Sequence, residues 1–315
     1  MRALVLEPQP VLRTDYPDPS PVAGETIVRV RLAGICGTDL ELARGYMSYH
    51  GVPGHEFVGE VSETQSPVLT GRRVVGEINA ACRRCAWCNA GLARHCPNRT
   101  VLGIAGRDGA FAEFLRLPDE NLVPLPDSVP DELGVFVEPV AAIYEIFEQT
   151  KLKSEATLAV LGDGRLGALA ALVLRAEGYA PLLVGHHREK LDRLASFGIN
   201  VQLEDEVAPG FEAAIDCTGA ASGLERALAI VRPRGTIILK STAAGSAPIN
   251  LAPAVINEVT IIGSRCGRFA PALAALACGK VDPRPLISKV FALDDAPAAF
   301  ATAARSPNFK VLLKP

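Results

Sequence analysis

Four closely spaced cysteines are the most distinctive chemical feature of this sequence. They are separated by two, two and seven residues, and they are Cys82, Cys85, Cys88 and Cys96. Thiolates at such short intervals suit tetrahedral coordination of Zn²⁺. A disulfide framework would require a secreted protein, which nothing in the sequence indicates, and four unrelated buried thiols are the other alternative. We therefore expect a closed, structural zinc site within a lobe at residues 80–98.

A second set of metal-ligating residue types is spread along the first half of the chain. Cys36 lies in the segment Gly-Ile-Cys-Gly-Thr-Asp, His55 in Gly-His-Glu, and Glu138 directly before a proline. A catalytic zinc needs three protein ligands and an open position, which these three residues could provide. Each of them alone would more often be a packing, capping or solvated residue. Together, and beside the cysteine lobe, they predict a second zinc site with a catalytic role.

A glycine-rich segment of the G-x-G-x-x-G type lies between a predicted strand at 157–161 and a predicted helix at 166–177. It consists of Gly162, Asp163, Gly164, Arg165, Leu166 and Gly167. In this context one glycine permits the tight turn, one lets the backbone approach a pyrophosphate, and one lets the helix pack on the strand. The N–H groups at the start of the helix would then bind the phosphates. The segment predicts a dinucleotide site.

The end of the next predicted strand bears on the choice of dinucleotide. NAD sites usually carry an acidic residue there, which accepts hydrogen bonds from the adenosine ribose. Here the chain has Gly185, His186, His187 and Arg188 instead. Arg188 could pair with a 2′-phosphate, with help from either histidine, so the sequence favours NADP over NAD. A solvated loop at the start of a helix is the alternative interpretation.

The pattern of predicted elements divides the chain into two regions. Up to about residue 120, short apolar runs separated by Gly, Pro and Asn predict β-strands at 26–32, 57–61, 73–78 and 110–117. Beyond about residue 154, strands at 157–161, 181–184, 213–216, 236–240 and 259–262 alternate with helices at 166–177, 189–197 and 222–231. That alternation predicts a parallel, doubly wound sheet. Early prolines predict an extended or edge start, and residues 309–313 a closing strand.

Composition limits the possible functions. The 315 residues favour two domains, and 49% hydrophobic residues suffice for two cores. A net charge of −3 gives no reason to expect a nucleic-acid partner. No apolar run reaches the roughly 18 residues of a membrane span, and Glu7 interrupts any signal-peptide core. We expect a soluble, cytoplasmic protein with no membrane partner.

These motifs, in this order, resemble the zinc-dependent medium-chain dehydrogenases of the alcohol and polyol dehydrogenase superfamily, and the resemblance covers essentially the whole chain. It implies an α/β protein with a GroES-like, β-rich catalytic domain and a Rossmann domain. The catalytic domain would comprise residues 1–150 and 266–315, and the Rossmann domain residues 151–265. It also implies catalytic and structural Zn²⁺, NADP or NAD, and a homodimer or homotetramer.

The resemblance also implies roles for individual residues. Glu138 followed by proline is similar to the third zinc ligand of the sorbitol, threonine and glucose dehydrogenase-like groups. Glu56 would be an alternative zinc ligand or a neighbour of the metal that moves, and Asp39 would orient His55. Thr38 would relay a proton. The implied reaction is hydride transfer between NAD(P) and a small alcohol, namely a polyol, a sugar or another primary or secondary alcohol, giving an aldehyde or ketone.

The substrate pocket is poorly specified by the sequence. Tyr46, Met47, Tyr49 and His50 lie between the first two predicted ligands and either line the cleft or form a surface loop. Three other functions stay open. A zinc-free reductase would lack the ligands, a dinucleotide-binding protein would show no turnover, and a zinc-lobe interaction module would use basic residues around the cysteines, namely Arg83, Arg84 and Arg94.

Overall fold

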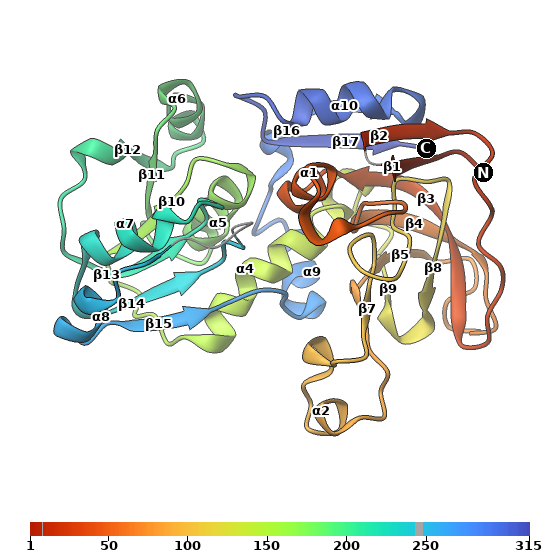
Figure 1. The fold of residues 1–315 in the computed structure, drawn as a ribbon, viewed down its shortest axis with the longest axis horizontal. Coiled ribbons are helices and arrows are strands. Elements are labelled where there is room, and N and C mark those ends of the chain that lie inside the picture. Colours follow the sequence, from red (N-terminus) through yellow and green to blue (C-terminus); the bar gives the residue numbers. More distant parts are fainter. Residues whose placement is uncertain (8, 243–247) are drawn as a thin grey trace. The chain divides into compact units, whose positions relative to one another are not determined.

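The computed structural model describes residues 1–7, 9–242 and 248–315, which form two compact units (Figure 1). The first contains residues 1–138 together with 287–315, and the second contains residues 139–286. The second unit therefore begins before the expected residue 151 and ends beyond the expected residue 265. It gains residues at both ends because the Lys240 ammonium binds the Ala142 carbonyl from α4 (Val137–Gln149) and the Arg265 carbonyl.

The first unit is built on a seven-stranded sheet. Its order is β16–β17–β3–β4–β5–β9, and β8 also pairs with β3. The strands are β3 (Glu25–Gly34), β4 (Glu56–Glu63), β5 (Arg73–Gly76), β8 (Phe114–Pro118), β9 (Leu122–Pro124), β16 (Ile287–Ala292) and β17 (Lys310–Lys314). The last strand of the chain, β17, pairs antiparallel with β3 through Leu312 and Gly34. The two distant segments of the unit thus share one sheet.

Smaller elements complete the first unit. Strands β1 (Ala3–Glu7) and β2 (Gln9–Arg13) form an antiparallel pair that tolerates Pro10 because β2 has only one neighbour. The cysteine lobe carries β6 (Asn79–Ala80), α2 (Ala86–Asn89) and β7 (Thr100–Val101). Helices α1 (Gly37–Ala43), α3 (Asp131–Gly134) and α10 (Ala296–Ala303) also belong to this unit. The expected strand at 110–117 begins only at Phe114, since the Ala110 and Phe111 amides bind the Gly54 and Pro53 carbonyls.

The second unit contains a sheet of six parallel strands in the order β12–β11–β10–β13–β14–β15. Their bounds are β10 (Leu158–Leu161), β11 (Leu182–Gly185), β12 (Asn200–Leu203), β13 (Phe211–Asp216), β14 (Val231–Leu239) and β15 (Thr260–Gly263). The predicted doubly wound sheet is confirmed. In such a sheet, ligands bind beyond the carboxyl ends of the strands where the strand order reverses, which here is between β10 and β13.

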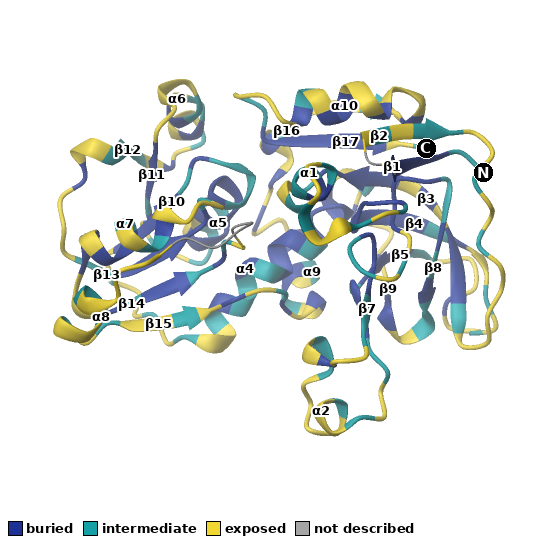
Figure 2. Cartoon of the chain, in the orientation of Figure 1, coloured by how far each residue is buried: buried dark blue, intermediate teal, exposed yellow. Residues whose placement is uncertain are grey.

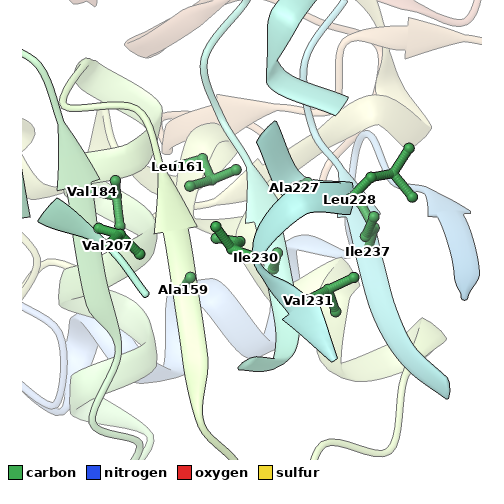
Figure 3. Close-up of a cluster of buried hydrophobic side chains, with 10 residues drawn as sticks. Ala159, Leu161, Val184, Val207, Ala227, Leu228, Ile230, Val231 and Ile237 are labelled. Carbon is green, nitrogen blue, oxygen red and sulfur yellow. The ribbon is translucent and has the colours of Figure 1, made fainter. Parts of the chain in front are cut away.

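Helices pack on this sheet and bury its apolar strands. They are α5 (Arg165–Ala176), α6 (Arg188–Ser196) and α7 (Ser222–Ile230). The unit also contains α8 (Ala252–Ile256), α9 (Phe269–Ala277) and most of α4. One core cluster joins side chains of β10, β11 and β14 to α7, including Leu161, Val184, Ile237 and Leu228 (Figure 3). Strand β10 is buried along its whole length, whereas α8 is largely exposed (Figure 2). None of the described helices is long and apolar enough to cross a membrane.

Candidate active site

The four lobe cysteines converge on one point. Their sulfur atoms all lie within 4.8 Å of one another. The separations are 3.5 Å for Cys85–Cys88, 3.7 Å for Cys85–Cys96 and 3.5 Å for Cys96–Cys82. A disulfide would need about 2.05 Å, whereas a tetrahedron with Zn–S bonds of about 2.3 Å has sulfur atoms about 3.8 Å apart. The geometry fits one tetrahedral zinc held by four thiolates.

The lobe turns sharply beside its first cysteine, and the pKa values of its thiols are shifted in opposite directions. Arg83 has a left-handed backbone with φ of 58°, so the chain turns sharply after Cys82. A hydrogen bond from the Arg84 backbone, aided by Cys96, lowers the pKa of the Cys82 thiol to about 6. Burial raises the pKa of Cys88 to about 12. A bound metal would hold all four as thiolates.

A second cluster forms where β3 and β4 lie side by side. Cys36 is the N-cap residue of α1, just beyond the end of β3, and His55 directly precedes β4, whose first residue is Glu56. The antiparallel register pairs Gly34 with Glu56 and brings these segments together. Ligand atoms of Cys36, His55 and Glu56 all lie within 4.8 Å of one another. The site is therefore built from two adjoining strand ends.

Asp39 supports this cluster from a fully buried position on α1. One carboxylate oxygen accepts the Cys36 N–H at 2.8 Å, and the other accepts the Gly54 N–H at 3.1 Å. The second oxygen also lies 3.3 Å from His55 Nδ1, without hydrogen-bond alignment. Burial opposes the charged imidazole, but Asp39 and Cys36 outweigh it and raise the pKa of His55 well above its usual value. Asp39 thus fixes both segments that carry the cluster.

Glu56 is held by a lysine from the other end of the chain. The Lys310 ammonium on β17 pairs with Glu56 Oε2, and both side chains are almost completely buried. Lys310 Nζ also lies 5.6 Å from the centre of the Phe136 ring. The backbone of β3 leaves room for this pair only because residue 34 is glycine, since a Cβ there would lie 2.7 Å from Glu56 Oε2.

Glu138, predicted as the third zinc ligand, is not part of the group of three. It is half-buried near the cluster, and desolvation raises its pKa to about 7 although His55 and Lys310 act in the opposite direction. Nearby Glu56 and Glu77 add to the increase. The structure thus brings Glu56 into the compact group of three and leaves Glu138 as a half-buried neighbouring carboxyl.

The donor set of this cluster fits Zn²⁺. A thiol, an imidazole and a carboxylate are all zinc ligands, and three protein ligands leave a position for a substrate. His55 Nδ1 is buried without a hydrogen-bond partner and lies 3.3 Å from Asp39 Oδ1, so an imidazole nitrogen is held unpaired within the group. Thr38 Oγ1 lies 3.9 Å from Cys36 Sγ, on the first turn of α1. A hydroxyl therefore stands directly beside the metal-binding group.

The glycines of the dinucleotide loop have different surroundings. Gly162 has φ of 108°, and a Cβ there would lie 2.9 Å from the Cys217 carbonyl. A Cβ on Gly167 would lie 1.8 Å from the Gly162 carbonyl oxygen, so α5 could not pack so closely with any other residue. Gly164 faces open space at the N-cap of α5, and Arg165 and Leu166 form the first turn. Such a loop leaves backbone N–H groups open to a phosphate.

Asp163, between the first two glycines, has a role that the sequence did not reveal. Its buried Oδ2 accepts the backbone N–H groups of His186 at 2.9 Å and His187 at 2.8 Å. The His187 ring and Lys190 also approach it. Burial opposes ionisation, but these partners lower the pKa of Asp163. Asp163 therefore ties the glycine loop to the segment that precedes α6.

The three basic residues predicted at the cofactor site differ in their contacts. The His187 ring lies against Asp163, and the Arg188 guanidinium is 3.8 Å from the Glu206 carboxylate. Only His186 lines a cavity of about 450 Å³, in which it meets Glu204. The acidic and basic partners in this cavity could not be predicted from the motif around β11, because they come from the short helix that follows β12 and from α7. A carboxylate directly after β12, the third strand of this sheet along the chain, is the sequence signal that could have indicated Glu204.

The loop between the first two predicted ligands has a partly structural role. The Tyr49 hydroxyl donates to the Val52 carbonyl at 2.8 Å and also lies 3.2 Å from the Arg107 carbonyl. Tyr49 is thus engaged in holding the loop. Met47, with φ of 58°, and His50 are exposed, whereas Tyr46 is partly buried.

Comparisons with known proteins agree with this fold and site. Residues 22–127 match the family model "Alcohol dehydrogenase GroES-like domain", and residues 166–278 match "Zinc-binding dehydrogenase". The chain is similar to an L-threonine 3-dehydrogenase of Streptomyces coelicolor, with 32% identity over 99% of both chains. The chain belongs to the zinc-type medium-chain alcohol dehydrogenase family. The predicted family, and with it the fold of a GroES-like domain and a Rossmann domain, are confirmed.

Two solved structures resemble the chain over its whole length. One is a protein described as a short chain alcohol dehydrogenase from Escherichia coli CFT073 in complex with NADH, with a TM-score of 0.89 and 25% identity over 100% of this chain and 99% of that one. The other is a putative zinc-binding dehydrogenase from Sinorhizobium meliloti 1021 bound to NADP, with a TM-score of 0.89, 26% identity and the same coverage. Zinc and NAD(P) are the cofactors of this family.

Proposed function

We propose that this protein is a zinc-dependent dehydrogenase that transfers a hydride between a small alcohol and NAD(P). The observation that carries the proposal is the compact group of Cys36, His55 and Glu56 within 4.8 Å, in a chain that also folds a dinucleotide loop. A zinc ion at this group would supply Lewis-acid chemistry that lowers the pKa of an alcohol, and a nicotinamide would accept the hydride.

The chain's own residues have separate tasks in this proposal. Cys36 and His55 hold the metal, and Asp39 fixes their two segments by hydrogen bonds to the Cys36 and Gly54 amides. Glu56 and Glu138 are the two candidates for the third ligand. Lys310 balances the charge of Glu56 in the buried site. Thr38 Oγ1 accepts the proton of the alcohol and passes it towards solvent.

The cysteine lobe holds the second zinc in this proposal and takes no part in the reaction. It is a closed site with four sulfur ligands and no open position. The alcohol itself is drawn from the polyols, sugars and amino alcohols on which family members act. The two carboxyls around the metal group, the buried Glu56 and the half-buried Glu138, favour a substrate that brings hydroxyl groups rather than a further negative charge.

The test is to supply a panel of polyols, sugars and hydroxy amino acids with NAD and with NADP and to follow the absorbance of the reduced nicotinamide. Turnover of at least one alcohol, lost in His55→Ala and lowered in Thr38→Ala with zinc retained, is the expected result. Dinucleotide binding without turnover of any alcohol would instead favour a non-catalytic binding protein. Unchanged turnover in His55→Ala would refute the metal-based scheme.

We further propose that the protein is a homodimer or homotetramer that pairs through the second unit. Strand β15 lies at the edge of the six-stranded sheet, and it carries no charged residue or proline. Beside it in the chain, Val255 and Ile256 are each 77% exposed. An exposed apolar edge strand is a template for pairing with an identical strand. Light scattering should show an oligomer that Ile261→Lys dissociates, whereas a monomeric wild type would contradict this assignment.

A further inference from the structure

The cavity at the end of β11 contains an unusual group of charged side chains. It has a volume of about 450 Å³, enough for the adenosine half of a dinucleotide, and lies at the carboxyl ends of β11 and β12, beside α7. Its lining residues are Gly185, His186, Leu203, Glu204, Asp205 and Arg226. No carboxylate comes from β11 itself, the strand that usually supplies one in NAD sites.

The absence of an acid at the end of β11 has a steric cause. A Cβ on Gly185 would lie 2.5 Å from the Asp163 Cβ and 2.6 Å from Asp163 Oδ2. Asp163 cannot easily move away, because its carboxylate accepts hydrogen bonds from the His186 and His187 backbone N–H groups. Any side chain at position 185 would therefore collide with the glycine loop. A ribose-binding acid therefore cannot be accommodated at position 185, at the end of β11.

A carboxylate reaches the same edge of the sheet from the next strand. The parallel register pairs Gly185 with Leu203, so His186 and Glu204 follow side by side. Glu204 Oε2 lies 2.8 Å from His186 Nε2, and Glu204 Oε1 lies 3.6 Å from Arg226 Nε. The Glu204 side chain is 28% exposed, so it is accessible from the cavity yet held by two basic neighbours.

We propose that Glu204 takes over the task of the missing acid and makes the protein select NAD rather than NADP. The inference rests on the proposed dehydrogenase function and deepens it. The Glu204 carboxylate would accept the 2′- and 3′-hydroxyl groups of the adenosine ribose. His186 and Arg226 position that carboxylate.

The charges in the cavity support this choice. Two carboxylates, those of Glu204 and Asp205, line the cavity together with Arg226 and His186. A 2′-phosphate would add about two negative charges to this wall. Arg188, the residue that favoured NADP at the level of sequence, is not among the lining residues, and the nearest carboxylate to its guanidinium is Glu206 at 3.8 Å. The His187 ring is likewise engaged by Asp163.

The experiment is isothermal titration of the zinc-loaded, full-length protein with NAD⁺ and with NADP⁺, which requires no substrate. The wild type is expected to bind NAD⁺ at least about tenfold more tightly. Glu204→Gln removes the charge with little change in shape and is expected to reduce that preference by at least about tenfold. Glu204→Asp, which keeps the charge, should retain most of it. Glu206→Gln is the matched control, because Glu206 lies in the same short helix as Glu204 but outside the cavity lining.

The outcomes separate this inference from the function on which it rests. If neither dinucleotide binds to the wild type, the proposed dehydrogenase function fails. If both bind but the wild type prefers NADP⁺, or Glu204→Gln leaves the ratio of affinities unchanged, only the role of Glu204 is refuted. If the ratio of NAD⁺ to NADP⁺ affinity changes more in Glu206→Gln than in Glu204→Gln, the selection depends on Arg188, the partner of Glu206, and the inference is overturned. Equal melting temperatures of the variants exclude a folding defect.

Discussion

Replacing Gly185 by alanine should destabilise the second unit by a route that the structure specifies. The added Cβ would lie 2.5 Å from Asp163 Cβ, which is closer than carbon atoms approach in proteins. Asp163 is only 6% exposed and holds the His186 and His187 amides. The substitution therefore forces either an overpacked contact or the loss of these hydrogen bonds.

The expected loss in the free energy of unfolding is the sum of two costs, one for the overpacked contact and one for the broken hydrogen bonds. Overpacking a buried site costs about 1–3 kcal/mol, and leaving a buried backbone donor unpaired costs about 1–3 kcal/mol. A loss of about 2–6 kcal/mol is expected when both contribute. For a unit of this size, the lower value corresponds to a fall of about 4–8 °C in the melting temperature.

A double-mutant cycle isolates the contact. Asp163→Gly removes the Cβ, Cγ and Oδ2 atoms that the new Cβ meets, so Gly185→Ala should cost almost nothing in that background, with a coupling energy of about 1–3 kcal/mol. Gly164→Ala is the matched control, since it lies in the same loop at a negative φ and a Cβ there meets no atom within 4 Å. Urea unfolding of the four proteins measures the free energies.

Two results would refute this reasoning. Additive effects of Asp163→Gly and Gly185→Ala would show that Asp163 is not the obstacle at position 185. A Gly185→Ala protein as stable as the wild type would show that the glycine loop moves freely, and would reopen that position to a ribose-binding acid.

Three further predictions concern other charged and sulfur-containing groups. Lys310→Met leaves the Glu56 carboxylate buried without its partner. It should lower the free energy of unfolding, measured by urea titration, by about 3–5 kcal/mol, and the double variant Lys310→Met/Glu56→Gln should recover part of this loss. The pKa of Asp163 is lowered in the folded state from its usual value of 3.8. The ionised carboxylate should therefore stabilise the fold fully above pH 3.8, and this stabilisation should be lost as the pH falls through the lowered pKa. The melting temperatures of the wild type and Asp163→Asn should accordingly converge on acidification. Cys85→Ser should remove about one zinc per chain and lower the melting temperature, and an unchanged zinc content would exclude the lobe as a metal site.

The local parts of this architecture could be predicted from the sequence. Five of the six strands of the parallel sheet follow from short apolar runs between turn residues, and their parallel direction follows from the alternation with helices. Strand β12 (Asn200–Leu203) was not predicted, because Asn200 and Gln202 interrupt its apolar residues. The cysteine lobe depends on residues only a few positions apart, so its spacing alone indicates convergence. The different surroundings of Gly162, Gly164 and Gly167 were also foreseeable, because the loop must turn, stay open and pack in that order.

The remaining features depend on contacts between distant segments. The pairing of Glu56 with Lys310 joins residues 254 positions apart, so no local pattern shows that Glu56 enters the compact group in preference to Glu138. The contact of Asp163 with His186 and His187 requires β10 and β11 to be adjacent. The bounds of the two compact units likewise depend on α4, whose first turn contains the Glu138-Pro139 pair and which packs closely against Gly267.

The most direct test of the central claim is the zinc content per chain of the wild type and of Cys36→Ser, measured by mass spectrometry of the metal. Two sites of the observed composition predict about two zinc ions in the wild type and about one in Cys36→Ser, with alcohol oxidation lost. Retention of both zinc ions together with full activity in Cys36→Ser would contradict the assignment of a catalytic zinc to Cys36, His55 and their neighbouring carboxylates.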